Sequence, residues 1–228
     1  MNSDTKRGVA RWIFKSIVYT VLFGLALFVP SGDLGWGWGW GYLAIYVINQ
    51  IILTAILPRD LLAERSKPQE GSKGWDIVLA SVAALLAPLV VYLVAGFDRG
   101  RGWSETFPPA LSIVGLGVMV GGIALSDWAM VANKFFSGVI RIQADRGHTV
   151  ETGGPYRFVR HPGYVGGILH HLGAPLMLGS WWALIPGGIG ALLFVLRTAL
   201  EDKTLQQELP GYAEYAQRTR YRLLPGVW

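Results

Sequence analysis

The sequence predicts an all-α protein, a polytopic transmembrane bundle of about six apolar helices. Hydrophobic residues make up 52% of the 228 residues and charged residues only 15%, against about 25% in typical globular chains. Six apolar stretches are long enough to be considered as membrane spans. They cover residues 12–30, 38–57, 76–97, 110–132, 163–180 and 182–200.

The first four stretches reach the length of about 20 apolar residues that a helix needs to cross the hydrocarbon core. The first could instead be a cleaved signal peptide, because Lys6, Arg7 and Arg11 resemble a basic leader region. No convincing small-residue cleavage site follows Pro30. We therefore interpret this stretch as a retained anchor.

The last two stretches meet at residues 180–182, and this spacing predicts a tight helical hairpin. Either a full crossing or a shallow insertion of the hairpin is compatible with its length. In the fourth stretch, Gly117 and Gly121 form a small-xxx-small pair, which we interpret as a helix-packing site.

The basic residues indicate the orientation of the bundle. With six crossings, 18 of the 20 Lys and Arg residues lie on one side, and only Arg99 and Arg101 lie on the other. Because Lys and Arg accumulate on the cytoplasmic side, both termini are expected in the cytoplasm. We therefore expect an integral protein of a bacterial inner membrane, with membrane lipids as partners.

Several classes of function are excluded by composition. The net charge of +5 does not indicate nucleic acid, because the basic residues do not cluster in a soluble domain. The absence of cysteine excludes disulfides, cysteine-ligated metals and a cysteine nucleophile. His170 and His171 have no third ligand at a suitable spacing, so no metal site is expected.

Polar residues are concentrated in a loop, 133–162, and a tail, 197–228. The predicted hairpin joins these segments, so both lie on one membrane face and can converge. We expect a single domain, 1–228, in which residues 1–132 form a four-span bundle. Residues 133–228 then supply a ligand-binding loop, the hairpin and a C-terminal cytoplasmic helix.

The loop segment contains an imidazole and a phenol close to a helix start. Pro162 suits the first turn of the fifth apolar helix, where free backbone N–H groups favour an anion. Arg157, Arg160 and His161 add donors there, although Arg157 could simply anchor the chain to headgroups. His161 and Tyr164 lie about one helical turn apart, which indicates a polar site.

The tail segment begins with Arg197 and Glu201, which share a helix face because they are four residues apart. In a soluble helix this pair would be an ordinary surface ion pair. At the end of an apolar span, where ionisable residues are costly and often functional, we favour a functional role. Tyr212 and Tyr215 follow a break at Pro210 and could cover the site.

These residues, in this order and spacing, resemble the isoprenylcysteine carboxyl methyltransferase family, part of a broader group that includes the phospholipid N-methyltransferases. The resemblance is confined to the C-terminal part of the chain. The matching residues are Gly154-Pro155-Tyr156-Arg157, Arg160-His161-Pro162-Gly163-Tyr164, Arg197, Glu201-Asp202, Leu205, Gly211-Tyr212 and Tyr215.

The resemblance implies S-adenosylmethionine as methyl donor, bound at the cytoplasmic face. It places Arg197 and Glu201 near the methyl-transfer centre, and Asp202 stands where many relatives have Glu. The cofactor-binding residues that it implies are Gln143, His148, Gly153, Tyr156, His161, Pro162, Tyr164, Glu201 and Asp202.

The expected function is therefore that of an integral-membrane methyltransferase acting on a lipophilic or small acceptor. Carboxylate, amine and thiol acceptors are each compatible with these residues. The alternative is a non-catalytic membrane protein of the same fold that binds lipid or supports a complex.

Overall fold

The computed structural model describes residues 3–228, and the elements of these residues are all helical. The long helices are α1 (Ser3–Ser31), α2 (Gly37–Ile56), α5 (Ala87–Arg101), α6 (Pro109–Ala132), α7 (Pro162–Met177) and α8 (Leu184–Glu208). The short ones are α3 (Arg59–Arg65), α4 (Gly74–Ser81), the π-helical turn η1 (Val82–Leu86), the 3₁₀ turns η2 (Ala144–Arg146) and η3 (Gly154–Arg157), and α9 (Tyr212–Arg218).

The chain is an integral membrane protein by the length and apolar character of its helices. Five helical segments of residues 3–228 are long and apolar enough to span a membrane. The third is α4, η1 and α5 joined end to end over Gly74–Arg101. The helix α7 has 16 residues, or about 24 Å, which is shorter than the roughly 30 Å hydrocarbon core. Five of the six expected stretches therefore meet the length of a span.

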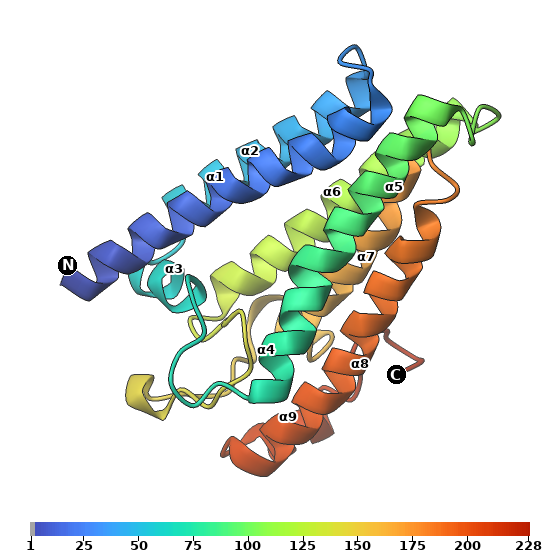
Figure 1. Ribbon diagram of the computed structural model, residues 1–228. Coiled ribbons are helices and arrows are strands. Elements are labelled where there is room, and N and C mark those ends of the chain that lie inside the picture. The colour runs from blue at the N-terminus through green and yellow to red at the C-terminus, as the bar shows by residue number, and fades with distance from the viewer. Residues whose placement is uncertain (1–2) are drawn as a thin grey trace.

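The bundle has one end of short turns and one end of longer loops (Figure 1). The α1–α2, α5–α6 and α7–α8 connections share the first end. The helix α3, the loop after α6, and α9 gather at the other end, where α8 extends beyond its apolar part to Glu208. This second end carries the polar segments 133–162 and 197–228, so they do converge as expected.

The closest helix pair, α6 and α7, packs through glycines. A Cβ on Gly122 would lie 2.7 Å from the Gly166 carbonyl oxygen, and one on Gly115 would meet the α7 backbone at Met177. By contrast, nothing lies within 4 Å of a Cβ on Gly117 or Gly121. The expected packing pair is therefore wrong. Gly117 and Gly121 face away from α7, since residues 115 and 122 occupy the contacting face.

Candidate functional site

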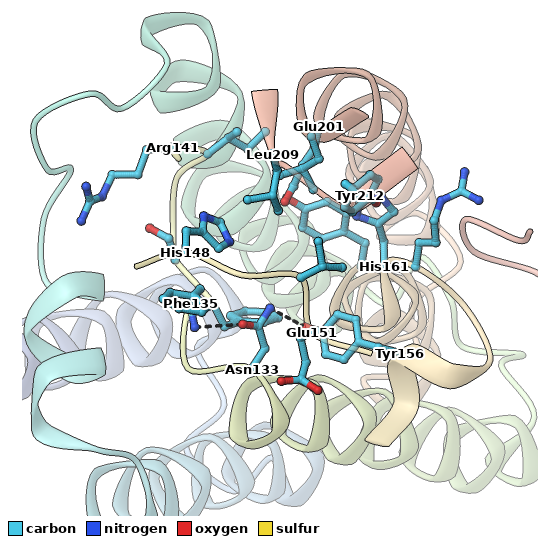
Figure 2. A pocket seen from close by; sticks show the side chains of 18 of the residues that line it. Asn133, Phe135, Arg141, His148, Glu151, Tyr156, His161, Glu201, Leu209 and Tyr212 are labelled. Atoms are coloured by element: carbon cyan, nitrogen blue, oxygen red, sulfur yellow. Dashed lines mark hydrogen bonds between the residues drawn. The ribbon is translucent and has the colours of Figure 1, made fainter. Parts of the chain in front are cut away.

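A cavity opens at the loop end of the bundle, between the loop 133–161, α7, α8 and α9 (Figure 2). It contains about 780 Å³ of space free of protein atoms, counted out to its open mouth. This size suits a small-molecule ligand. Its wall includes Asn133, Phe135, Phe136, Arg141, His148, Glu151, Tyr156, Arg160, His161, Tyr164, Arg197, Glu201, Leu205, Leu209, Tyr212 and Tyr215.

Arg197 is held in place by a buried carboxylate. Its Nε and Nη2 atoms donate to the two oxygens of Asp76 at 2.7 and 2.8 Å, and Asp76 is fully buried. Asp76 also accepts the Ile140 amide proton at 2.6 Å, and Arg197 Nη2 donates to the Gly138 carbonyl at 2.9 Å. One guanidinium therefore joins α4, α8 and the loop after α6. Its Cζ atom lies over the Tyr164 ring, 5.1 Å from the centroid.

The adjacent acids Glu201 and Asp202 point to different places, because successive helical residues are about 100° apart. The Glu201 carboxylate lines the cavity and accepts a hydrogen bond from the Tyr164 hydroxyl. Asp202 is fully buried outside the cavity wall. It pairs with Arg160 at 2.7 Å and with Arg222 at 2.8 Å, and it accepts the Tyr212 hydroxyl proton at 3.0 Å.

The His161 ring lies over the Tyr164 ring, with centroids 5.6 Å apart and an interplanar angle of 6°. Its Nε2 atom lies 3.3 Å from both Asp202 Oδ1 and the Tyr212 hydroxyl. The His161 amide donates to the Arg222 carbonyl at 3.0 Å. The C-terminal segment and α8 therefore fix the imidazole in the cavity wall.

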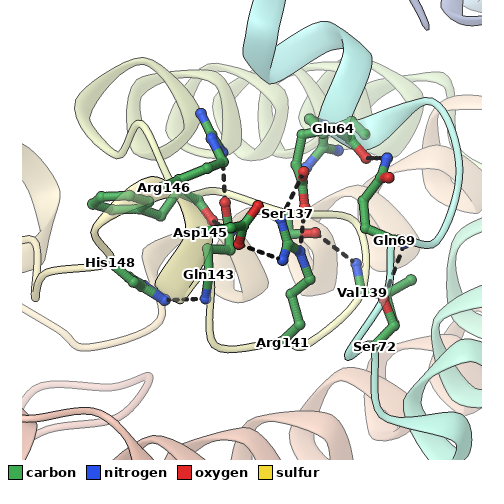
Figure 3. A network of polar contacts seen from close by, with 12 residues as sticks. Glu64, Gln69, Ser72, Ser137, Val139, Arg141, Gln143, Asp145, Arg146 and His148 are labelled. Atoms are coloured by element: carbon green, nitrogen blue, oxygen red, sulfur yellow. Dashed lines mark hydrogen bonds and ion pairs between the residues drawn. The ribbon is translucent and has the colours of Figure 1, made fainter. Parts of the chain in front are cut away.

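A polar network behind the part of the cavity wall formed by the loop after α6 orders that loop (Figure 3). The Gln143 side chain is fully buried, donates to the Phe135 carbonyl at 2.7 Å and accepts from Arg146. The His148 Nδ1 atom accepts the Gln143 amide proton at 3.2 Å. Burial and the nearby charges of Arg141 and Arg146 lower the pKa of His148 to about 4. The neutral imidazole is the form that this hydrogen bond requires.

Aromatic rings form much of the remaining wall. The Tyr215 hydroxyl donates to the Tyr156 carbonyl at 2.7 Å, which holds α9 against η3. The Tyr212 and Tyr215 rings lie edge to face, 5.5 Å apart. Burial raises the pKa of Tyr215 to about 12, so its phenol is neutral at physiological pH. As the sequence suggested, α9 folds its tyrosines over the site.

The structure brings six of the expected site residues into the cavity wall: His148, Tyr156, His161, Tyr164, Arg197 and Glu201. The other four, which were expected to contact a cofactor, lie outside it: Gln143, Gly153, Pro162 and Asp202. Gln143 and Asp202 are buried because they hold the loop and the tail together. Arg157 lies outside the cavity as well and donates to the Gly154 carbonyl of its own turn.

Other groups at the site were not found from the sequence. Asp76 is paired with a residue 121 positions away, and Glu64, on α3, binds Arg141 at 2.7 Å from 77 positions away. No local spacing signals such partners. Glu151 was also missed. It lies three residues after the expected site residue His148, and this proximity could have indicated it. Within residues 3–228, no three His, Asp or Glu side chains group closely enough to hold a metal ion.

The fold and the cavity define an integral membrane protein with a polar and aromatic site at one end of its bundle. Comparison with known proteins is consistent with this class. Residues 111–210, which contain α7 and most of the cavity wall, match the phospholipid methyltransferase family.

The chain is also similar to several curated proteins. It is 31% identical over 111 residues to a probable protein-S-isoprenylcysteine O-methyltransferase of Oryza sativa subsp. indica, covering 47% of this chain and 58% of that protein. The protein-S-isoprenylcysteine O-methyltransferase of Schizosaccharomyces pombe is 35% identical over 82 residues, 36% of this chain and 32% of its own. The cobalt-zinc-cadmium resistance protein CzcN of Cupriavidus metallidurans is 39% identical over 151 residues, 64% of this chain and 59% of its own.

The expected resemblance is therefore seen over the C-terminal part of the chain, which is similar to the phospholipid methyltransferase family and to proteins named as isoprenylcysteine O-methyltransferases. The chain spans no more than 59% of the length of these three relatives.

Proposed function

We propose that the protein is an S-adenosylmethionine-dependent methyltransferase that acts on a lipophilic or small acceptor at the cytoplasmic membrane face. The observation that carries this proposal is the convergence of Arg197, Glu201, Tyr164 and His161 on one cavity within the family-matched region. Ionisable groups at the end of an apolar helix are costly, and a ligand site is a reason for their presence.

The chemistry of the cavity wall fits the proposed cofactor. S-adenosylmethionine has a sulfonium, an ammonium, a carboxylate and ribose hydroxyls. The rings of Tyr156 and Tyr212 line the cavity, and aromatic faces attract a cation. Carboxylates such as Glu201 can accept hydrogen bonds from hydroxyl or ammonium groups, and Arg197 can donate to a carboxylate or a polar acceptor. When bound, the cofactor would supply an electrophilic methyl group.

The residues of the chain would mainly position the reactants and exclude water. The Arg197 Nε and Nη2 atoms are engaged by Asp76 and Gly138, so the orientation of the guanidinium is fixed before an acceptor arrives. Tyr164 orients the Glu201 carboxylate. Glu201 would hold the cofactor, or take a proton from a neutral acceptor. Preorganisation of this kind supplies much of the rate of a direct displacement.

The relatives and the chemistry of the cavity leave three classes of acceptor. Two of the relatives are named for O-methylation of isoprenylcysteine, and the matched family for phospholipids. A prenylated cysteine carboxylate, an amine headgroup and a small thiol are each compatible with a polar cavity at the end of a membrane bundle. A lipid acceptor would reach the cavity laterally, while the cofactor would come from the cytoplasm.

The test is a labelled-methyl transfer assay with purified protein and a native membrane lipid extract, followed by identification of the labelled product. We expect label in a lipid or small-molecule fraction, and loss of at least about tenfold in Glu201→Gln. A Glu208→Gln variant, which changes an exposed carboxylate on the same helix, serves as the control. If no label is transferred and the protein binds lipid without needing S-adenosylmethionine, the non-catalytic alternative is favoured instead.

A further inference from the structure

The arginines of the cavity wall are all neutralised from behind. Arg141 binds Glu64 at 2.7 Å and Asp145 at 2.8 Å. Arg160 binds Asp202 and Arg197 binds Asp76, each at 2.7 Å. These carboxylates lie outside the cavity wall. Asp202 is shared with Arg222, at 2.8 Å, so four arginines stand against four carboxylates. These groups together add little net positive charge to the cavity.

Two carboxylates of the wall, by contrast, have no basic partner. Among the ion pairs of residues 3–228, none includes Glu151 or Glu201. Among these residues, Glu201 accepts a hydrogen bond from the neutral Tyr164 hydroxyl and interacts with Arg197 through charge without pairing with it. His148, which could have supplied a positive charge, is neutral above about pH 4 because of its lowered pKa. Arg65, which lies behind the wall and donates to the Phe136 carbonyl, offsets one of these two negative charges. The wall and its supports still carry one more carboxylate than arginine, which favours a cationic ligand.

Glu151 is held in a defined orientation. Its Oε1 atom accepts the Gly153 amide proton at 2.7 Å, in the turn that leads into η3. Glu151 is half-buried, and Figure 2 shows its carboxylate beside Tyr156, across the cavity from Glu201. Burial raises the pKa of the Tyr156 phenol, and the charges of both Glu201 and Glu151 add to that rise. Both carboxylates therefore lie close enough to the Tyr156 phenol to affect its pKa.

We propose that Glu151 is a further ligand-binding residue, whose carboxylate pairs with the ammonium group of the amino-acid portion of the bound cofactor. This inference rests on the proposed function and deepens it. The Oε1 atom is used by the Gly153 turn, so the second oxygen is the one available to a ligand. Glu201, on the opposite side, is then left for the reacting end of the ligand. A half-buried carboxylate with no internal counter-ion is suited to a charged partner, because the pair is only partly screened by solvent.

The test compares three ligands by isothermal titration calorimetry on the detergent-solubilised full chain. S-adenosylmethionine and S-adenosylhomocysteine both have the ammonium group, whereas 5′-methylthioadenosine lacks the amino-acid portion. In Glu151→Gln the remaining carbonyl oxygen can still accept the Gly153 amide proton, so the turn is preserved. Glu214→Gln, an exposed carboxylate on α9 outside the cavity wall, is the matched control.

We expect Glu151→Gln to weaken both ammonium-bearing ligands at least about tenfold, while 5′-methylthioadenosine changes by less than about twofold and the control leaves all three unchanged. Unchanged affinities, an equal loss for 5′-methylthioadenosine, or a loss confined to S-adenosylmethionine would each overturn the assignment. If the wild-type protein binds none of the ligands, the proposed function fails as well. If the wild-type protein binds the ligands and Glu151→Gln binds them with the same affinities, only the inference about Glu151 fails.

Discussion

At the scale of single residues, the adjacent acids Glu201 and Asp202 have different roles: the first lines the cavity and the second stabilises the fold. Glu201 faces the cavity with a single hydroxyl partner, whereas Asp202 is fully buried among Arg160, Arg222 and Tyr212. Replacing either acid by its amide tests this division, because the two changes are chemically identical.

Asp202→Asn should lower the free energy of unfolding by about 3–5 kcal/mol, since it leaves buried arginine charge without its partner. Glu201→Gln should change the stability by less than about 1 kcal/mol while reducing methyl transfer. The comparison requires thermal unfolding midpoints in detergent and initial transfer rates for both variants. Equal destabilisation by the two variants would show that Glu201 is also a structural residue.

His148 predicts a pH dependence of stability. Its pKa is about 4 in the folded protein and about 6.5 when unfolded. The unfolded chain therefore binds more protons in this interval, and stability falls as the pH drops from about 6.5 towards 4. His148→Asn keeps an acceptor for the Gln143 amide and does not titrate there. As the pH is lowered from about 6.5 to 4, the unfolding midpoint of His148→Asn should fall less steeply than that of the wild type. An equal fall in both proteins would contradict a lowered pKa of His148.

Six of the ten expected site residues line the cavity, whereas the residues that support them were not predictable. His161, Tyr164, Arg197 and Glu201 follow from motif order and helical spacing. The partners Asp76 and Glu64 come from the N-terminal part of the chain, and nothing local in the sequence marks them. Helical spacing placed Glu201 on the face of Arg197. The burial of Asp202 was not predictable, because its partners on the loop and the tail are set by tertiary packing.

At the scale of elements, the contact between α6 and α7 depends on the exact register of glycines. The sequence indicated a glycine-mediated contact in α6 but not its face, because apolar residues surround the helix on every side. The structure places Gly122 against the α7 backbone and leaves Gly121 open. This contact positions α7, and hence His161 and Tyr164 at its start.

Gly122→Ala should therefore destabilise the protein by about 1–3 kcal/mol, because the new methyl group meets backbone atoms that cannot move aside. Gly121→Ala is the matched control and should be neutral or slightly stabilising. Thermal unfolding of the two variants in the same detergent provides the comparison. A larger effect of Gly121→Ala would mean that the register of the α6–α7 contact is different.

At the scale of the whole molecule, the helical class and the convergence of the two polar segments were predictable from hydropathy. The number of spans was harder to predict. The apolar stretch of α7 runs on into the α7–α8 turn, so the helix itself is too short for a crossing. The proposed cytoplasmic location of the cavity rests on the distribution of Lys and Arg.

The absence of cysteine from the natural sequence allows this orientation to be tested directly. Single cysteines at the exposed positions Lys203, at the cavity end, and Glu105, at the opposite end, can be treated with an impermeant maleimide. In intact bacterial cells, Glu105→Cys should react and Lys203→Cys should react only after lysis. The reverse pattern would place the cavity outside the cytoplasm.

The central claim is that the cavity is a binding site for S-adenosylmethionine. The most direct measurement is isothermal titration of S-adenosylmethionine into the detergent-solubilised wild-type protein, with Glu201→Gln and Glu208→Gln in parallel. We predict saturable binding at close to one site per chain, weakened in Glu201→Gln and unchanged in Glu208→Gln. Absence of binding by the folded wild-type protein at millimolar S-adenosylmethionine would contradict the account.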